Sequence, residues 1–267
     1  MNILSKLNEV TINNTSRIAE TDRKFCENQY EQYVAAREAL QQALNIIKPA
    51  YEEEKKSLDN SLNRCYLNEY CDIAPIEKRL EEIKEYFISE VVYHFSRQYK
   101  VTLDTAVINK KYDIYLTQHD IIAEIFEQLG GFNFEEKAVH ELIEKTKSTI
   151  YNFDKVSIKK TSLSIAGFIS WDAWGWNGFS LSHGSNKEQS LFTALSHFEN
   201  GSVKMLDSLF NIHEEMRKGS NDHDIFSKYE FGYEKIRSIK IFKNRKITIE
   251  FKNQTLAQEF ANTYLKK

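Results

Sequence analysis

Residues 1–129 contain no glycine, and all nine glycines of the chain lie at or after Gly130. Tight turns often need a positive φ angle, which glycine adopts more readily than any other residue. A glycine-free stretch of this length is therefore typical of long helices rather than of many short strands joined by turns. The sequence predicts a strongly helical N-terminal half and a C-terminal half in which strands and turns appear.

Apolar periodicity supports this division. From residue 26 to residue 47 a stripe repeats at alternating intervals of four and three residues, and a second stripe runs from residue 76 to residue 95. This spacing places side chains on one face of a helix. We expect two or three long antiparallel helices, packed within one chain rather than as a dimeric coiled coil.

Shorter elements follow the long helices. Residues 99–116 are mixed and predict two short strands. Thr117 and Asp120 form the pattern of a capping box for the next helix, which Gly130 and Gly131 end. A further helix is expected from Asn133 to about residue 148.

The sequence period changes to two near residue 154. Residues 154–165 alternate apolar and polar side chains, as one half-buried strand does. Residues 236–251 predict a β-hairpin with Asn244 in the turn. Its inward side chains are expected to be Ile239, Ile241, Ile247, Ile249 and Phe251. Thr255 and Gln258 then suggest a capping box for a last helix.

These patterns predict an α+β chain that is predominantly helical. Residues 1–150 are assigned to a helical part with long antiparallel helices and two short ones. Residues 151–267 are assigned to a mixed part with a small antiparallel sheet, a tryptophan-rich loop and a basic hairpin. The charge follows the same division, because the first part has a net charge of −7 and the second +4, within a total of −3. A polyanion would therefore favour the second part.

Several classes of protein are disfavoured by what the sequence lacks. The three cysteines have no CxxC pairing, which argues against a disulfide framework or a cysteine zinc site. No apolar run reaches the length of a membrane span, and the N-terminus does not have the pattern of a signal peptide. We expect a cytoplasmic protein without membrane contact, cofactor or resident metal.

No catalytic motif stands out. The phosphate loop GxxxxGK[ST], the dinucleotide motif GxGxxG and the nucleophile motif GxSxG are all absent. Glu250-Phe251-Lys252 has the form of a metal-nuclease strand, with Asp222 and Asp224 as upstream acids. The same triplet also fits a strand whose Phe251 faces inward and whose charged neighbours face solvent. The sequence thus favours a non-enzymatic protein, with a metal-dependent nuclease as an alternative.

Two surface features are candidates for binding. Basic residues and one aromatic residue gather in the hairpin, a composition that grips phosphates and stacks a base. A solvated edge hairpin is the alternative interpretation. The predicted nucleic-acid contacts are Lys235, Arg237, Lys240, Phe242, Lys243, Arg245 and Lys246. An aromatic cluster in a glycine-punctuated loop is either core or a partner-binding surface. Its members are Trp171, Trp174, Trp176 and Phe179.

Several segments together resemble a domain-of-unknown-function family of bacteria, phages and plasmids. They are QYVAAREALQQAL, EQLGGFNFEEKA, SLFTALSHFENGSVKML and IKIFKNRKITIEFKNQTLAQEFA. Some members of that family are joined to, or encoded beside, DNA methyltransferase domains. The resemblance implies an accessory protein of a mobile genetic element, acting in DNA modification or in counter-defence.

The sequence and the resemblance together predict a binding protein rather than an enzyme. Its partner would be DNA or RNA, or a protein of host defence or DNA modification, engaged through the C-terminal half. A pure protein-interaction module built on the long helices is the alternative.

Overall fold

The computed structural model describes residues 14–57, 73–175, 178–184, 186–219 and 223–266. The chain divides into two compact units, Met1–Glu135 and Glu136–Lys267, and each has its own hydrophobic cluster. The described part of the first unit is helical, whereas the second combines helices with two antiparallel sheets. The predicted class, α+β and predominantly helical, is confirmed.

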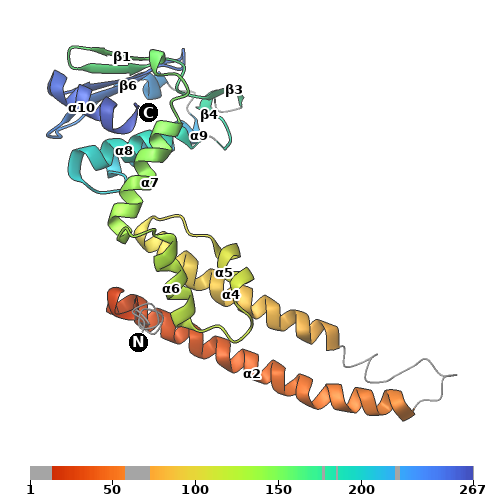
Figure 1. Cartoon of the computed structure of the whole chain (residues 1–267). Helices are drawn as coiled ribbons and strands as arrows, with labels where there is room; N and C mark the ends of the chain where they lie inside the picture. Colours follow the sequence, from red (N-terminus) through yellow and green to blue (C-terminus); the bar gives the residue numbers. More distant parts are fainter. Residues whose placement is uncertain (1–13, 58–72, 176–177, 185, 220–222, 267) are drawn as a thin grey trace, which may run out of the picture. The chain divides into compact units, whose positions relative to one another are not determined.

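The N-terminal unit is built on two long helices, α2 (Glu20–Ser57) and α4 (Ile73–Tyr99) (Figure 1). They run antiparallel, because Phe25 near the start of α2 stacks on His94 near the end of α4, with 4.1 Å between ring centroids. The predicted long antiparallel helices are therefore present. The other elements of this unit are η1 (Asn14–Arg17), α5 (Thr105–Lys111) and α6 (Gln118–Gln128).

Of the two predictions made for the short elements of this unit, one is confirmed and one is wrong. At α6 the predicted capping box is confirmed, because Thr117 and Asp120 exchange both side-chain-to-backbone hydrogen bonds. The two strands predicted within residues 99–116 are wrong. Asp104 instead accepts a hydrogen bond from the Ala106 N–H at 2.8 Å and caps α5. Ile108 of α5 is buried in the cluster between the long helices, so tertiary packing decides in favour of a helix.

A buried carboxylate ties α2 to α4. Asp22 is only 2% exposed, and its Oδ1 lies 2.7 Å from Nε2 of His94. Its Oδ2 accepts a hydrogen bond from the Tyr99 hydroxyl. Burial is the main reason why the pKa of Tyr99 is raised to about 12, and the bond to Asp22 adds to it. These contacts satisfy a polar group that would be costly to bury alone.

The C-terminal unit begins within the first turn of α7 (Phe134–Ser148). Its main sheet has the strand order β1-β2-β7-β6-β5, and a second sheet pairs β3 with β4. The strands are β1 (Val156–Lys159), β2 (Ser162–Ile165), β3 (Trp171–Gly175), β4 (Gly178–Leu181), β5 (Lys228–Glu230), β6 (Ile236–Ile241) and β7 (Ile247–Phe251). The other elements are η2 (Phe153–Lys155), α8 (Lys187–Asn200), α9 (Asp207–Lys218), η3 (His223–Phe226) and α10 (Gln254–Tyr264).

One face of the main sheet is packed against helices. Figure 1 shows α8 and α10 on the same side of the sheet, and α10 contacts β1, β2 and β7. The inward side chains predicted for the hairpin are confirmed, because all five are fully buried. Alternation therefore places Lys240, Thr248 and Glu250 on the opposite face of the sheet. An irregularity between Ile236 and Ser238 brings Arg237 to the same face, where it donates to Glu250.

Two local predictions in this unit are corrected by the structure. Residues 154–165 form two strands instead of one, because Lys160 adopts a φ of 51° and reverses the chain, and Val156 then pairs with Ile165. The last helix is capped by Asn253, whose side chain accepts from the Leu256 N–H at 2.9 Å. Thr255 lies inside the helix and is not its cap.

Two expectations from composition can be compared with the described residues. Cys26 is a free, buried thiol, whereas Cys65 and Cys71 lie outside the described ranges. Within those ranges no helix combines the length and the apolar character that crossing a bilayer requires.

Candidate nucleic-acid interface

The turn of the β6–β7 hairpin concentrates four of the predicted basic residues. Its backbone closes through the Phe242 N–H, which donates to the Lys246 carbonyl at 2.9 Å, and the Arg245 N–H, which donates to the Phe242 carbonyl at 3.0 Å. Arg245 has a φ of 67°, which allows the tight reversal. The folding of the turn therefore brings Lys240, Lys243, Arg245 and Lys246 to one end of the hairpin.

Phe242 lies between two of these cations. The Nζ atoms of Lys240 and Lys246 lie 5.3 Å and 4.2 Å from the centroid of its ring. The ring is half-buried, and the two ammonium groups lie over it, where a base would have to stack. The arrangement thus favours contact of the lysines with phosphates over stacking of a base on Phe242.

Lys243 projects over an aromatic cluster behind the turn. Its Nζ lies 5.7 Å from the ring centroid of Phe179 and 5.4 Å from that of Phe226. Trp171 completes the cluster, and its indole Nε1–H donates to the Phe242 carbonyl at 3.3 Å. The aromatic cluster therefore supports the turn from within.

The same contacts bear on the predicted partner-binding surface. Trp171 is buried at 7% exposure and Phe179 is half-buried against the core, a placement that favours the core interpretation for both residues. The side chain of Trp174 and all of Trp176 lie outside the described part of the structure.

Lys235 lies apart from the turn. Its Nζ donates to the Phe198 carbonyl and sits 4.8 Å from the centroid of that ring. Its backbone N–H and that of Ile236 donate to the carboxylate of Glu199, at 3.1 Å and 3.0 Å. Lys235 is thus held at the end of α8, where its contacts join helix and sheet.

Arg237 also lies apart from the turn, in an ion-pair network on the outward face of the sheet. Glu250 accepts from Arg237 at 3.2 Å, from Lys228 at 3.1 Å and from the Ser238 hydroxyl at 3.1 Å. The hydrogen bond from Lys228 is the main cause that lowers the pKa of Glu250 below its ordinary value. Lys228 is a residue that sequence reasoning missed, because only the β5–β6 pairing brings it to this face.

Strand register arranges the outward face in rows. One row crosses all five strands and has hydroxyl and ammonium groups but no carboxylate. In pairing order its members are Ser157, Ser164, Thr248, Lys240 and Lys228. The next row contains the acids, in the order Lys159, Ser162, Glu250, Ser238 and Glu230. The carboxylate-free row lies nearer the turn, so the positive end of this face and the basic turn are continuous.

The residues of the nuclease alternative are only partly described. Phe251 is fully buried, which leaves Glu250 and Lys252 on the other side of the strand, and Glu250 is engaged by the two cations above. Asp222 and the side chain of Asp224 lie outside the described residues. Among the residues that are described, no group of three histidine, cysteine, aspartate or glutamate side chains is placed to hold a metal ion.

Comparison of the chain with protein-family models, with curated proteins and with solved structures finds no match. The geometry of the hairpin and its sheet is therefore the basis for any functional conclusion.

Proposed function

We propose that this protein binds nucleic acid through the turn of the β6–β7 hairpin and the adjoining carboxylate-free row of the sheet. One observation carries the proposal. Lys240, Lys243, Arg245 and Lys246 converge within a single turn, and none of the ion pairs among the described residues involves any of them. By contrast, Lys228 and Arg237 on the same sheet form ion pairs, Arg237 with Glu250 and Lys228 with both Glu250 and Glu230.

Clustered cations without carboxylates repel one another, and a polyanion relieves that repulsion. Each phosphate contact also releases condensed counterions, which makes binding favourable and dependent on salt. The hydroxyl groups of Ser164 and Thr248, 2.8 Å apart in the next strands, extend the surface with further hydrogen-bonding groups. A phosphate backbone that follows the row from Lys240 toward Ser157 would meet one polar side chain on each strand.

The proposal is tested by titrating labelled DNA and RNA with the full chain at several salt concentrations. Four phosphate contacts predict a slope of log K against log salt of about −3.6 for duplex DNA and about −2.8 for a single strand. Substituting glutamine for Lys240, Lys243, Arg245 and Lys246 together removes most of that slope. The control variant is Arg79→Gln with Arg97→Gln, two exposed cations of the N-terminal unit, which leaves the slope unchanged. Wild-type protein without salt-dependent binding to any nucleic acid would refute the proposal.

A second candidate function, protein interaction through the long helices, has one observation in its favour. Tyr86 and Tyr93 are 65% and 55% exposed on α4, and their spacing of seven residues places them on one side of the helix. Exposed tyrosines are enriched at protein interfaces. Tyr86→Ser with Tyr93→Ser should release a protein partner identified by cross-linking. A partner that the double variant retains would count against this candidate.

The biological setting of an accessory protein in a phage or mobile element remains a proposal, supported by the family resemblance of the sequence. It is compatible with either candidate, because DNA modification and counter-defence both require contact with DNA or with a protein that acts on it.

A further inference from the structure

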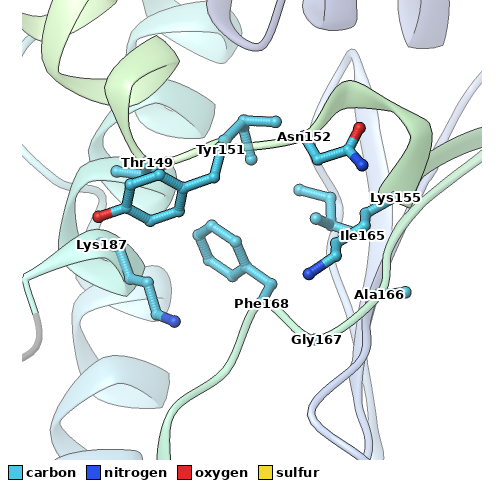
Figure 2. Close-up of a pocket in the computed structure, with 10 residues that line it drawn as sticks. Thr149, Tyr151, Asn152, Lys155, Ile165, Ala166, Gly167, Phe168 and Lys187 are labelled. Atoms are coloured by element: carbon cyan, nitrogen blue, oxygen red, sulfur yellow. The ribbon is translucent and has the colours of Figure 1, made fainter.

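The C-terminal unit contains a small cavity (Figure 2). It has a volume of about 60 Å³ and is lined by the chain that follows α7, by Lys155 of η2, by residues 165–168 at the end of β2 and by Lys187 at the start of α8. The lining comes from three stretches of the chain, residues 149–155, residues 165–168 and Lys187, which the fold brings together.

Two ammonium groups face this cavity. Figure 2 shows Lys155 and Lys187 on either side of Phe168, and the Lys187 Nζ lies 5.6 Å from the centroid of that ring. No carboxylate is among the residues that line the cavity. Neither lysine takes part in an ion pair with another described residue. The cavity therefore presents two ammonium groups that are not held in ion pairs within the described part of the chain.

The size of the cavity limits what can enter it. Pockets for drug-sized ligands usually measure about 300–1,000 Å³, whereas about 10–15 Å³ holds one water molecule. A cavity of about 60 Å³ thus has room for a small oxyanion but not for a nucleoside. Whatever molecule carries the anion must remain largely outside, on the surface around the cavity.

The surface around the cavity includes the proposed nucleic-acid interface. Ile165 pairs with Ile247 of the hairpin, and the Ile169 N–H donates to the Arg245 carbonyl at 3.0 Å. The intervening residues 166–168 form one wall of the cavity, so this wall lies directly alongside the basic turn. A strand held by the turn would reach the cavity without crossing another element.

We infer that this cavity binds a phosphate monoester, carried either by the end of a nucleic-acid strand or by a free nucleotide. Lys155 and Lys187 supply the two charge-assisted contacts, since ammonium groups are common partners of phosphate. A terminal phosphate fits better than an internal one, because an internal phosphodiester has chain on both sides and cannot enter so small a cavity. The strand-end source rests on the proposed nucleic-acid binding, whereas the free-nucleotide source does not.

The test compares three forms of one oligonucleotide of about 20 nucleotides, longer than the ~4–16 nucleotides that a small single-strand-binding fold covers. One form has a 5′-phosphate, one a 3′-phosphate and one only hydroxyl ends. Fluorescence anisotropy with the full chain should show roughly tenfold tighter binding of one phosphorylated form than of the hydroxyl form. Lys155→Gln with Lys187→Gln should reduce this ratio to about one and leave binding of the hydroxyl form within about twofold.

Three control variants separate the cavity from general charge and from the turn. Lys145→Gln with Lys204→Gln removes two exposed cations of the same unit and should keep the ratio. The four-glutamine hairpin variant should weaken all three forms and also keep the ratio. Lys187→Arg keeps the positive charge and should retain most of the preference for the phosphorylated form. This variant tests the role of the charge independently of any folding defect in the double glutamine variant.

A second arm titrates adenosine monophosphate and inorganic phosphate by calorimetry. Nucleotide binding that Lys155→Gln with Lys187→Gln abolishes supports the cavity with a free nucleotide as the source, even if no oligonucleotide binds and the nucleic-acid proposal fails. Oligonucleotides that bind without preference for a phosphorylated end, together with no nucleotide binding, overturn the cavity inference alone. A preference that survives loss of both lysines overturns it as well.

Discussion

Glu250→Gln is expected to change stability and nucleic-acid binding in opposite directions. The carboxylate of Glu250 engages Arg237 at 3.2 Å and Lys228 at 3.1 Å on the outward face of the sheet. Exposed ion pairs of this kind are worth about 0.2–1 kcal/mol each. The glutamine variant should therefore lose about 0.5–2 kcal/mol of unfolding free energy in urea titrations.

The same substitution leaves Arg237 without its carboxylate partner, whereas Lys228 keeps an ion pair with Glu230 at 3.4 Å. Each cation that then contacts a phosphate steepens the slope of log K against log salt by about 0.9 for duplex DNA. The variant should bind DNA more tightly than the wild type at low salt, with a slope steeper by about 0.9, the contribution of Arg237. Fluorescence anisotropy at four or more salt concentrations measures both quantities.

The matched control is Glu259→Gln, which makes the same charge change at an exposed position of α10, the helix that packs against the other face of the sheet. It should leave the slope unchanged. Weaker DNA binding by Glu250→Gln would contradict this reasoning. So would an equal gain in DNA affinity from Glu250→Gln and Glu259→Gln, because the gain would then not come from the cations that Glu250 engages.

Three further predictions concern stability. The pKa of Glu250 is lowered in the folded state, so the stability that its carboxylate contributes is complete above the ordinary value of 4.5 and is lost as pH falls through the folded pKa. The unfolding free energies of wild type and Glu250→Gln should therefore converge in acid. A constant difference between them down to pH 2 would contradict this. Asp22→Ala leaves His94 and Tyr99 without the carboxylate that they contact, and it should lower the unfolding free energy in urea by about 2–4 kcal/mol. The control Glu27→Ala, at an exposed position of the same helix, should lower it by less than about 0.5 kcal/mol. Equal losses would refute the role of Asp22 in joining α2 to α4. Gly201 caps the C-terminal end of α8 with a left-handed φ of 79°, so Gly201→Ala should lower the unfolding free energy by about 1 kcal/mol. Gly232, which does not have a left-handed φ, provides the control. A loss no larger than that of Gly232→Ala would contradict the role of Gly201 as a cap.

Some of the fold follows from local rules that act within a few residues. The absence of glycine before Gly130 and the apolar stripes predict the long helices, and the structure contains them. Alternation in residues 236–251 predicts the buried face of the hairpin, because successive side chains of a strand point to opposite sides. The capping box of Thr117 and Asp120 is equally local and equally predictable.

Other elements depend on packing that local rules do not contain. The strands expected within residues 99–116 are replaced by α5, whose Ile108 is buried among residues distant in sequence. The single strand expected at residues 154–165 becomes a hairpin because Lys160 adopts a left-handed φ, an uncommon conformation for lysine. In both cases contacts with the rest of the unit outweigh a weak local preference.

The candidate site shows the same limit. The clustering of basic residues in the hairpin is predictable, because these residues are neighbours along the chain. Tertiary contacts select which of them remain available at the turn: Lys235 is held by the Phe198 carbonyl of α8 and Arg237 by Glu250, whereas Lys240 and Lys246 lie over Phe242. Strand register and helix packing join residues from separate segments, and such long-range contacts leave no periodic signal in the sequence.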